Sequence, residues 1–160
     1  MTVTLSSLDE ARKELMKLKG KQLVNAVAWS PYQTFAHCAK TIEYSISGYP
    51  ALKPTIVRNT VGRLAIRKFL KQGYMQHNLV DDVPGSPAID NTGSAQDGVQ
   101  MLIKAIDKFK AYKGEFKPHL LFGRLTKAQY DQYFAMHIAN HLSAIDSSKI
   151  KQPVCSVSSQ

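Results

Sequence analysis

Apolar residues recur at helical spacing in several long segments of the chain, with polar residues between them. In the first segment, apolar side chains stand three or four residues apart at Leu8, Ala11, Leu15 and Leu18. This spacing places them on one face of an amphipathic helix. Ser7 and Glu10 form a capping box at its start, and Gly20 ends the run. The pattern predicts a helix that begins at Ser7 and stops at Gly20.

The second segment has the clearest start signal. Ser30 is the predicted N-cap, Pro31 takes the first helical position, and Gln33 completes a capping box. We expect this helix to run to Gly48. The predicted helix has two stripes of side chains along its length. The apolar stripe contains Phe35, Cys38, Ile42 and Ser45 or Ile46, and the polar stripe contains Thr34, His37, Thr41 and Tyr44. Polar residues stacked in this way beside an apolar stripe could line a buried pocket.

Two further helices are predicted in the second half of the chain. One opens at Ser94, with Asp97 as its third residue, and ends at Gly114. The other opens at Thr126 with another capping box and runs through Ile145.

A long connection separates the predicted helix that ends at Gly48 from the one that opens at Ser94. Its basic amphipathic stretch, IVRNTVGRLAIRKFLKQG, predicts one shorter helix, and DDVPGSPAIDNTGS predicts a loop. A crossover of about 45 residues is far longer than the roughly 2–8 that usually join helices in a bundle. We therefore predict an all-α bundle of four main helices with one long crossover. The bundle is expected to form a single domain over residues 1–146, and residues 147–160 are expected to form a loose polar tail.

Two histidines, His137 and His141, stand four residues apart near the end of the last predicted helix. Their side chains project from one face of a helix, with Cβ atoms roughly 6 Å apart, so one ion can bind both. Ile138 stands where zinc peptidases of the HExxH type have their general-base glutamate, which excludes that mechanism. Such a pair also arises by chance, with one imidazole capping the helix C-terminus and the other exposed.

His37 could supply a third imidazole from the second predicted helix. Three histidines with open positions for water or substrate are the layout of catalytic rather than structural metal sites. Taken alone, His37 is better explained as a buried histidine that is hydrogen-bonded to Thr34 or Tyr44. The candidate site therefore depends on whether the two helices pack together.

The remaining histidines and the cysteines suggest other roles. His77 lies in the polar stretch QHN and is expected to be exposed, and His119 follows Pro118, where it is expected to shape a loop. Cys38 is expected to be a small buried apolar group. With Cys155 as the only other cysteine, neither a disulfide framework nor a CxxC motif can be made.

The charge balance is basic, with 21 Lys and Arg against 12 Asp and Glu and a formal net charge of +9. Such an excess can attract nucleic acid, an anionic membrane or an anionic small molecule. The bases are spread along the chain, with a local concentration at Arg58, Arg63, Arg67, Lys68 and Lys71. A solvated protein surface explains these basic residues better than an anionic partner does, so nucleic acid is an unlikely partner. Neither a membrane-spanning run nor a signal peptide is present, so we expect no membrane partner and a cytoplasmic location.

Two stretches resemble a known family. They are WSPYQTFAHCAKTIEYSISGYP, over residues 29–50, and PHLLFGRLTKAQYDQYFAMHIANH, over residues 118–141. The first stretch has a tryptophan shortly before its histidine, and the second has an FGxL-type turn and a terminal HxxxH. Both stretches resemble the DinB/YfiT-like metalloenzyme superfamily. They are closest to an uncharacterised bacterial subgroup of it. The resemblance spans roughly residues 5–146 and includes the order of the parts and the long crossover.

The resemblance implies a four-helix bundle with up-down-down-up topology and a metal bound by His37, His137 and His141. It also implies a homodimer and, by similarity to characterised relatives, a low-molecular-weight thiol as cosubstrate. Many members continue the last motif as HxxHH, whereas this chain has Asn140 before His141, which puts the support of the ligands in question.

From these observations we hypothesise a metal-dependent enzyme of the thiol-dependent transferase or hydrolase type. A divalent ion, Zn²⁺ or Ni²⁺, would lower the pKa of a bound water or thiol. Possible pocket residues are Thr34, Thr41, Tyr44 and Asn140. Two alternatives remain: a non-catalytic metal-containing binding or stress-response module, and an anionic-partner binder that acts through the basic crossover helix. The catalytic residues and the substrate cannot be assigned from the sequence.

Overall fold

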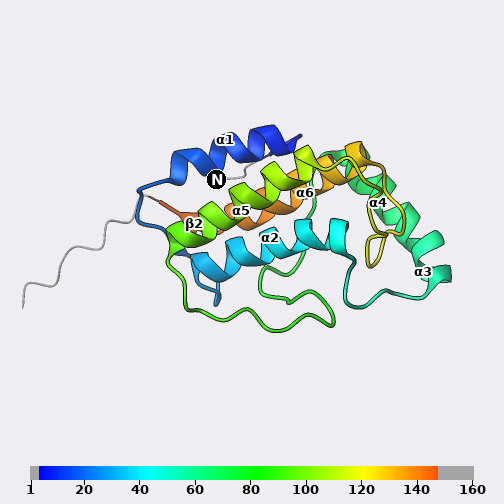
Figure 1. Ribbon diagram of the computed structural model, residues 1–160, viewed down its shortest axis with the longest axis horizontal. Helices are drawn as coiled ribbons and strands as arrows, with labels where there is room; N and C mark the ends of the chain where they lie inside the picture. Colours follow the sequence, from blue (N-terminus) through cyan, green and yellow to red (C-terminus); the bar gives the residue numbers. More distant parts are fainter. Residues whose placement is uncertain (1–3, 148–160) are drawn as a thin grey trace, which may run out of the picture.

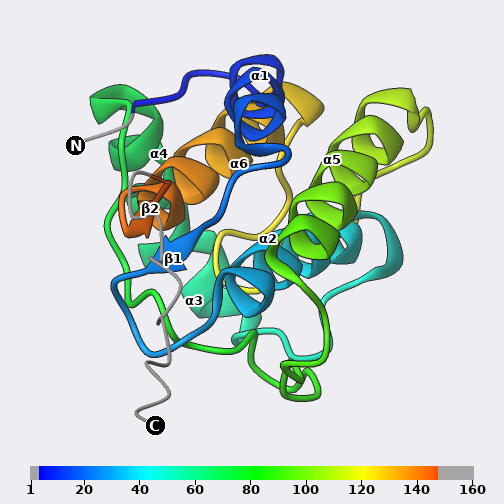
Figure 2. The same cartoon turned by 90° about the vertical axis from the view of Figure 1, so that its left-hand side faces the viewer.

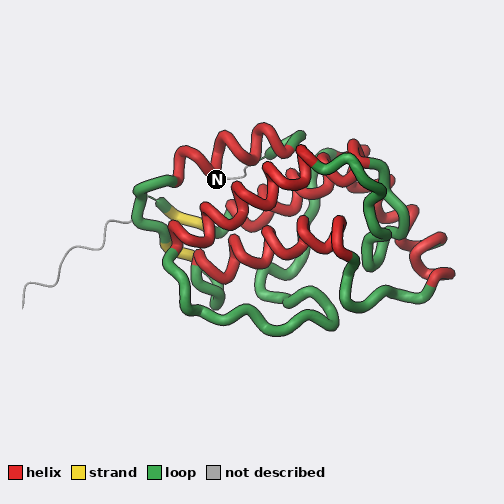
Figure 3. The backbone as a smooth tube through the Cα atoms, viewed as in Figure 1, coloured by secondary structure: helices red, strands yellow, loops and turns green. Residues whose placement is uncertain are grey.

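The computed structural model describes residues 4–147 and is mostly helical (Figures 1 and 3). The long helices are α1 (Leu8–Leu18), α2 (Pro31–Ser47), α5 (Ala95–Ala111) and α6 (Lys127–Leu142). Two shorter helices, α3 (Thr55–Asn59) and α4 (Val61–Gln72), lie in the connection between α2 and α5. The strands β1 (Val24–Asn25) and β2 (Ile145–Asp146) form one antiparallel pair. The predicted helical fold class is confirmed, and the predicted tail lies outside the described residues apart from residue 147.

The predicted helix starts are confirmed because each N-cap makes the expected hydrogen bond. Ser30, Ser94 and Thr126 each accept a bond from the backbone N–H three residues on, and each capping box is closed. Ser7 also accepts from the N–H of Glu10, but its predicted capping box is not closed, because the Glu10 carboxylate accepts from the N–H and hydroxyl of Ser6 instead. These local signals fix where the helices begin without help from tertiary contacts.

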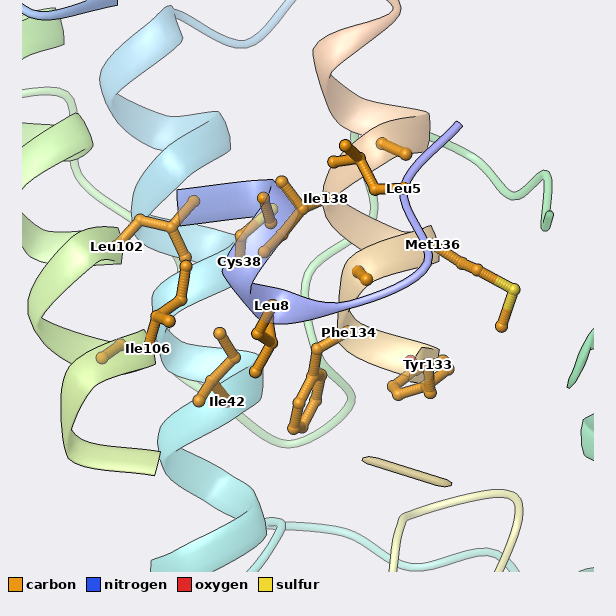
Figure 4. Close-up of a cluster of buried hydrophobic side chains, with 14 of the residues drawn as sticks. Leu5, Leu8, Cys38, Ile42, Leu102, Ile106, Tyr133, Phe134, Met136 and Ile138 are labelled. Atoms are coloured by element: carbon orange, nitrogen blue, oxygen red, sulfur yellow. The ribbon is translucent and has the colours of Figure 1, made fainter. Parts of the chain in front are cut away.

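The long helices bury their apolar faces in one core. Its fully buried members include Leu8, Ile42, Leu102, Ile106 and Phe134 from these helices (Figure 4), and Ile66 from α4 joins them. The most extensive helix contact is between α2 and α5, while α6 contacts α1, α2 and α4. Figure 2, seen nearly end-on, shows α2 and α5 together on one side of α6. The pairing of α2 with α6 is the contact on which the candidate site depends.

Several predicted helix boundaries are wrong. The single helix expected in the crossover is two helices, because Thr60 takes the non-helical angles φ −115° and ψ −91°. The third long helix ends at Ala111 rather than Gly114, since Tyr112 is already extended at ψ 129°. The last helix ends at Leu142, and Ile145 belongs to β2 instead. Two-residue strands are too short to leave an alternating pattern, so the sequence did not predict them.

No helix in the part of the chain that the structure describes is both long enough and apolar enough to cross a membrane.

Gly62 allows α4 to lie directly against the loop that follows His119. A Cβ at this position would lie 1.9 Å from the carbonyl oxygen of Leu121. We expect Gly62→Ala to lower the free energy of unfolding by about 1–3 kcal/mol, as overpacking does, although alanine favours a helix. Urea unfolding measures the change. Gly114→Ala is the control, because its close neighbours are side-chain atoms of Tyr112, which can move. Equal effects of the two substitutions would contradict the close approach of α4.

Candidate metal centre

Four histidines from three parts of the chain converge in the interior. His37 comes from α2, His137 and His141 come one turn apart from α6, and His77 comes from the segment between α4 and α5. Each offers one ring nitrogen, and the four nitrogens lie within 4.8 Å of one another. The structure therefore brings together the three histidines that the sequence singled out and adds a fourth.

The closest contacts join the Nε2 atoms in two pairs. His37 Nε2 lies 3.3 Å from His137 Nε2, and His77 Nε2 lies 3.1 Å from His141 Nε2. When a metal is bound by four nitrogens at 2.0–2.1 Å in a tetrahedron, neighbouring nitrogens are about 3.3–3.4 Å apart. The two spacings are close to this value.

Burial keeps the cluster uncharged. It lowers the pKa of His37 to about 4, with His77 as the second cause. The pKa values of His137 and His141 lie well below the ordinary value, first because of burial and then because of the neighbouring imidazoles. Burial also lowers the pKa of His77, against the opposing effect of Asp81. Since a metal binds the neutral imidazole, the ligands need not lose protons at neutral pH before they bind.

Two ring nitrogens on the outside of the cluster have no partner. The Nδ1 atoms of His37 and His141 are buried and make no hydrogen bond in the described structure. In neutral imidazoles that share protons only in pairs, such orphaned atoms cost about 1–3 kcal/mol each. A cation at the centre would be bound by the four converging nitrogens and would leave these two Nδ1 atoms without a partner, so the case for a metal rests on the convergence itself. The residues present thus fit a bound metal ion.

His77 was expected to be exposed, and this prediction is wrong. Its side chain is half-buried and stacks on His137 with ring centroids 4.7 Å apart. The side-chain amide of Asn140 holds it, lying 2.8 Å from His77 Nδ1 and donating to the His77 carbonyl at 3.4 Å. Because a loop has no periodicity, the three letters QHN gave no sign that this histidine turns inward.

The other predicted pocket residues have different surroundings. Thr34 is buried and accepts a hydrogen bond from Asn25 at 2.7 Å, while Thr41 donates to the carbonyl of His37 at 2.9 Å. Tyr44 contacts the ring of Tyr49 instead, at 5.8 Å between centroids. Only Thr41 and Asn140 of the four thus bond directly to a histidine of the cluster. The hydrogen bond expected between His37 and Thr34 or Tyr44 does not form, because Thr34 is engaged by Asn25.

Aromatic rings enclose two of the four histidines. Trp29 lies 5.3 Å from His37 between ring centroids, and Tyr133 stacks on His137 at 6.0 Å. These rings exclude water from the imidazoles, in line with the lowered pKa values. The tryptophan that stands shortly before His37 in the sequence therefore has a structural role beside it.

When the metal is bound, Asn140 is expected to support the centre by fixing the ring of His77, with its amide turned so that the oxygen accepts from Nδ1–H and Nε2 is free to bind the ion. Outer partners of metal-bound histidines are worth roughly 10–100-fold in metal affinity. We therefore expect Asn140→Ala to weaken Zn²⁺ binding by about that factor, measured by competition with a chromophoric chelator. Ser143→Ala is the matched control, since the hydroxyl that it removes bonds to the backbone carbonyl of Asn140 and not to a histidine. An unchanged affinity in Asn140→Ala would show that His77 needs no such support.

His119 shapes the loop before α6, as predicted. Its Nδ1 accepts the backbone N–H groups of Leu121 and Phe122 at 3.1 and 3.2 Å. Its Nε2 must then carry the proton, which it donates to the hydroxyl of Tyr133 at 3.2 Å. His119 is buried outside the four-histidine cluster and does not belong to the candidate site.

His119 should make the fold sensitive to acid. Burial lowers its pKa to about 3 from the ordinary value of 6.5, so between these values the unfolded chain binds a proton that the folded chain does not. Stability from this residue is complete above pH 6.5 and falls as the pH drops toward 3, by up to about 1.4 kcal/mol per pH unit. Urea unfolding with chelator present should therefore show a shallower pH dependence in His119→Gln than in the wild type. Parallel pH profiles would contradict the assignment.

Comparison with known protein families gives a match over most of the chain. The model of a family described as "Protein of unknown function (DUF1569)" matches residues 1–148. No curated protein and no solved structure matches the chain.

The match corrects the resemblance to the DinB/YfiT-like superfamily, which is wrong as a family assignment. The motifs behind it were short: a tryptophan, a turn and three histidines on two helices. Any helical protein that gathers histidines in this way can share them. The homodimer and the thiol cosubstrate were implied by that resemblance alone, whereas the contacts among the histidines do not depend on it.

Proposed function

Because the chain belongs to the DUF1569 family, whose description assigns no activity, we propose a function from the site itself. The proposed function is the binding of one divalent transition-metal ion by His37, His77, His137 and His141. The observation that carries it is the convergence of four ring nitrogens within 4.8 Å, three of them on buried side chains. Without a metal, the Nε2 atoms can share protons only within two pairs, whereas a cation would be bound by all four nitrogens at once.

The donor set favours particular metals. Imidazole nitrogens suit Zn²⁺, Ni²⁺ and Cu²⁺, whereas Mg²⁺ and Ca²⁺ prefer oxygen ligands. Spacings of 3.1 and 3.3 Å support a tetrahedral ion, and Zn²⁺ takes this geometry most readily. We therefore propose Zn²⁺ first and Ni²⁺ second. Four protein ligands would close the coordination shell, as in a site that stabilises a fold or stores an ion.

Metal analysis of tag-free protein tests this proposal. Protein purified without chelator should contain about one Zn²⁺ or Ni²⁺ per chain, or should take up one on addition of the salt. A protein that contains no metal and gains none on titration would overturn the proposal. Removal of the metal should lower the unfolding temperature, because an ion that binds only the folded state stabilises it.

A second candidate function, a metal-dependent enzyme, is favoured by the position of His77. Three ligands stand on helices, but His77 stands on a loop and is held by Asn140. Asn140 and Gln76 also line a cavity of about 290 Å³. If His77 gave way to a molecule in this cavity, His37, His137 and His141 would keep the metal, which could then lower the pKa of a water or thiol.

This candidate would be a hydrolase or a thiol-dependent transferase. Glu43, the only acidic residue of α2, is exposed and cannot act as a base within the cluster. In this candidate, the displaced His77 would act as the general base or acid. Hydrolysis and thiol-transfer assays on metal-loaded protein test the idea. Turnover that is lost in His77→Gln with the metal retained would support it, and absence of turnover leaves the binding function.

We also propose that α1, α2, α5 and α6 form one bundle whose helices run up, down, down and up. The contacts of α2 with α5 and α6, and of α1 with both, support this arrangement. The connection over residues 48–94 is long enough to return the chain to the starting end of α2 (Figure 1).

A further inference from the structure

The crossover helices carry positive charge without local compensation. Residues 44–80 contain no Asp or Glu, yet they hold six of the 21 basic residues: Lys53, Arg58, Arg63, Arg67, Lys68 and Lys71. The ion pairs of the described chain occur elsewhere, joining Arg12 to Asp107, Lys17 to Glu14, Lys110 to Asp9 and Arg124 to Glu115. Arg58 and Arg63 bond to backbone carbonyl groups, which leave their charge in place.

The same segment exposes large aliphatic side chains. The exposed fractions are 72% for Ile56, 63% for Val61 and 66% for Leu64. These are the three most exposed large apolar residues in the described chain. Exposed aliphatic residues scattered singly need no explanation, whereas three within nine positions concentrate exposed apolar side chains on one short segment.

Aliphatic and cationic side chains share one face of α4. Gly62 and Ile66 are buried and face the rest of the protein. Leu64 stands three, four and seven residues before Arg67, Lys68 and Lys71, so all four project from the opposite side. All four side chains are exposed. This outer face of α3 and α4, with Ile56, Val61, Leu64, Arg67, Lys68 and Lys71, is called the crossover face. Figure 1 shows α3 and α4 at one end of the molecule.

We propose that the crossover face binds the surface of an anionic lipid bilayer. Aliphatic side chains that enter the acyl boundary, flanked by Lys and Arg that contact the headgroups, are the composition of helices that lie in a membrane interface. The contact is peripheral, because no described helix can span a bilayer. This partner differs from the expectation of no membrane contact, which rested on the absence of a spanning segment.

The chemistry of the face disfavours two other occupants. A second copy of the chain would place one uncompensated positive surface against another, and like charges across an interface are costly. Nucleic acid is bound mainly through phosphate contacts of Lys, Arg and polar groups, which leaves three exposed aliphatic residues without a role. Of these three occupants, a lipid surface is the one that uses both the aliphatic and the cationic side chains of the face.

Vesicle co-sedimentation of the full chain tests the proposal. The protein should bind phosphatidylcholine vesicles that contain phosphatidylserine, and should bind pure phosphatidylcholine weakly. Arg67→Gln with Lys71→Gln should reduce binding about 25-fold, at about fivefold for each cation. Lys13→Gln with Lys19→Gln makes the same charge change on the α1 side and should have a much smaller effect. Val61→Ser with Leu64→Ser should also weaken binding, whereas Met16→Ser, at an exposed apolar position of α1, should not.

Three results would overturn the proposal. The first is equal loss in the crossover and α1 charge variants, which would mean attraction by net charge alone. The second is retention on duplex DNA with no binding to anionic vesicles. The third is a dimer, seen by sedimentation, that Val61→Ser with Leu64→Ser dissociates. Circular dichroism of each variant separates these results from loss of folding, and the substituted side chains are all exposed.

Discussion

Replacing His137 with alanine is expected to lower the affinity for Zn²⁺ by more than about 100-fold. Substitution of outer partners of metal ligands already costs roughly 10–100-fold, so removal of a ligand should cost more. His137 is 4% exposed, and its Nε2 atom lies 3.3 Å from that of His37. No neighbouring side chain can replace it, because the remaining imidazoles come from other positions around the centre.

The measurement is a competition titration with a chromophoric chelator, with circular dichroism to verify the fold. His119→Gln is the matched control, since it removes a buried imidazole that lies outside the cluster. It should leave the affinity unchanged. If His137→Ala and His119→Gln bind Zn²⁺ equally well, the ion binds somewhere other than the four-histidine centre.

Replacing Phe134 with alanine is expected to lower the free energy of unfolding by about 3–5 kcal/mol, as other buried Phe→Ala substitutions do. Phe134 is fully buried one turn before His137, with Tyr130 and Phe109 at 5.1 and 5.5 Å between ring centroids. The loss is a large part of the 5–15 kcal/mol that typically stabilises a domain. Urea unfolding of metal-free protein measures it.

Phe116→Ala provides the comparison, because Phe116 packs on the same ring of Phe109 but is only half-buried. Its effect should be clearly smaller. Where the Phe134→Ala protein is still folded it should bind one equivalent of Zn²⁺, since no ligand has been removed. A change below about 1 kcal/mol would contradict the position of Phe134 in the core.

The helix starts could be predicted from the sequence because their signals are local. Ser30, Ser94 and Thr126 each bond within their own first turn, so no distant contact is needed. Helix ends and breaks could not be predicted from local side-chain signals in the same way. Thr60 leaves helical geometry between α3 and α4 although TIVRN and VGRL read as one continuous pattern. β1 and β2 pair residues that are more than a hundred positions apart, and two-residue strands are too short to be predicted from a sequence pattern.

The candidate site was partly predictable for the same reason. His137 and His141 are one helical turn apart, so their proximity follows from the geometry of α6 alone. His37 could be proposed as their partner because it lies on a polar stripe of a helix that should be largely buried, but the packing of α2 on α6 could not be read from the sequence. His77 could not be placed, since the position of a loop residue depends on contacts such as the one with Asn140. The motif resemblance pointed to three of the four histidines but to the wrong family. Histidines close together on helices are not specific to one family.

X-ray absorption at the zinc edge, on tag-free protein loaded with one equivalent of Zn²⁺, tests the central claim most directly. A four-histidine centre predicts four nitrogen neighbours at about 2.0–2.1 Å, with the outer-shell scattering of imidazole rings. His137→Ala should lose one of these imidazoles. A shell made of oxygen atoms, or one that is unchanged in His137→Ala, would contradict a metal centre built from His37, His77, His137 and His141.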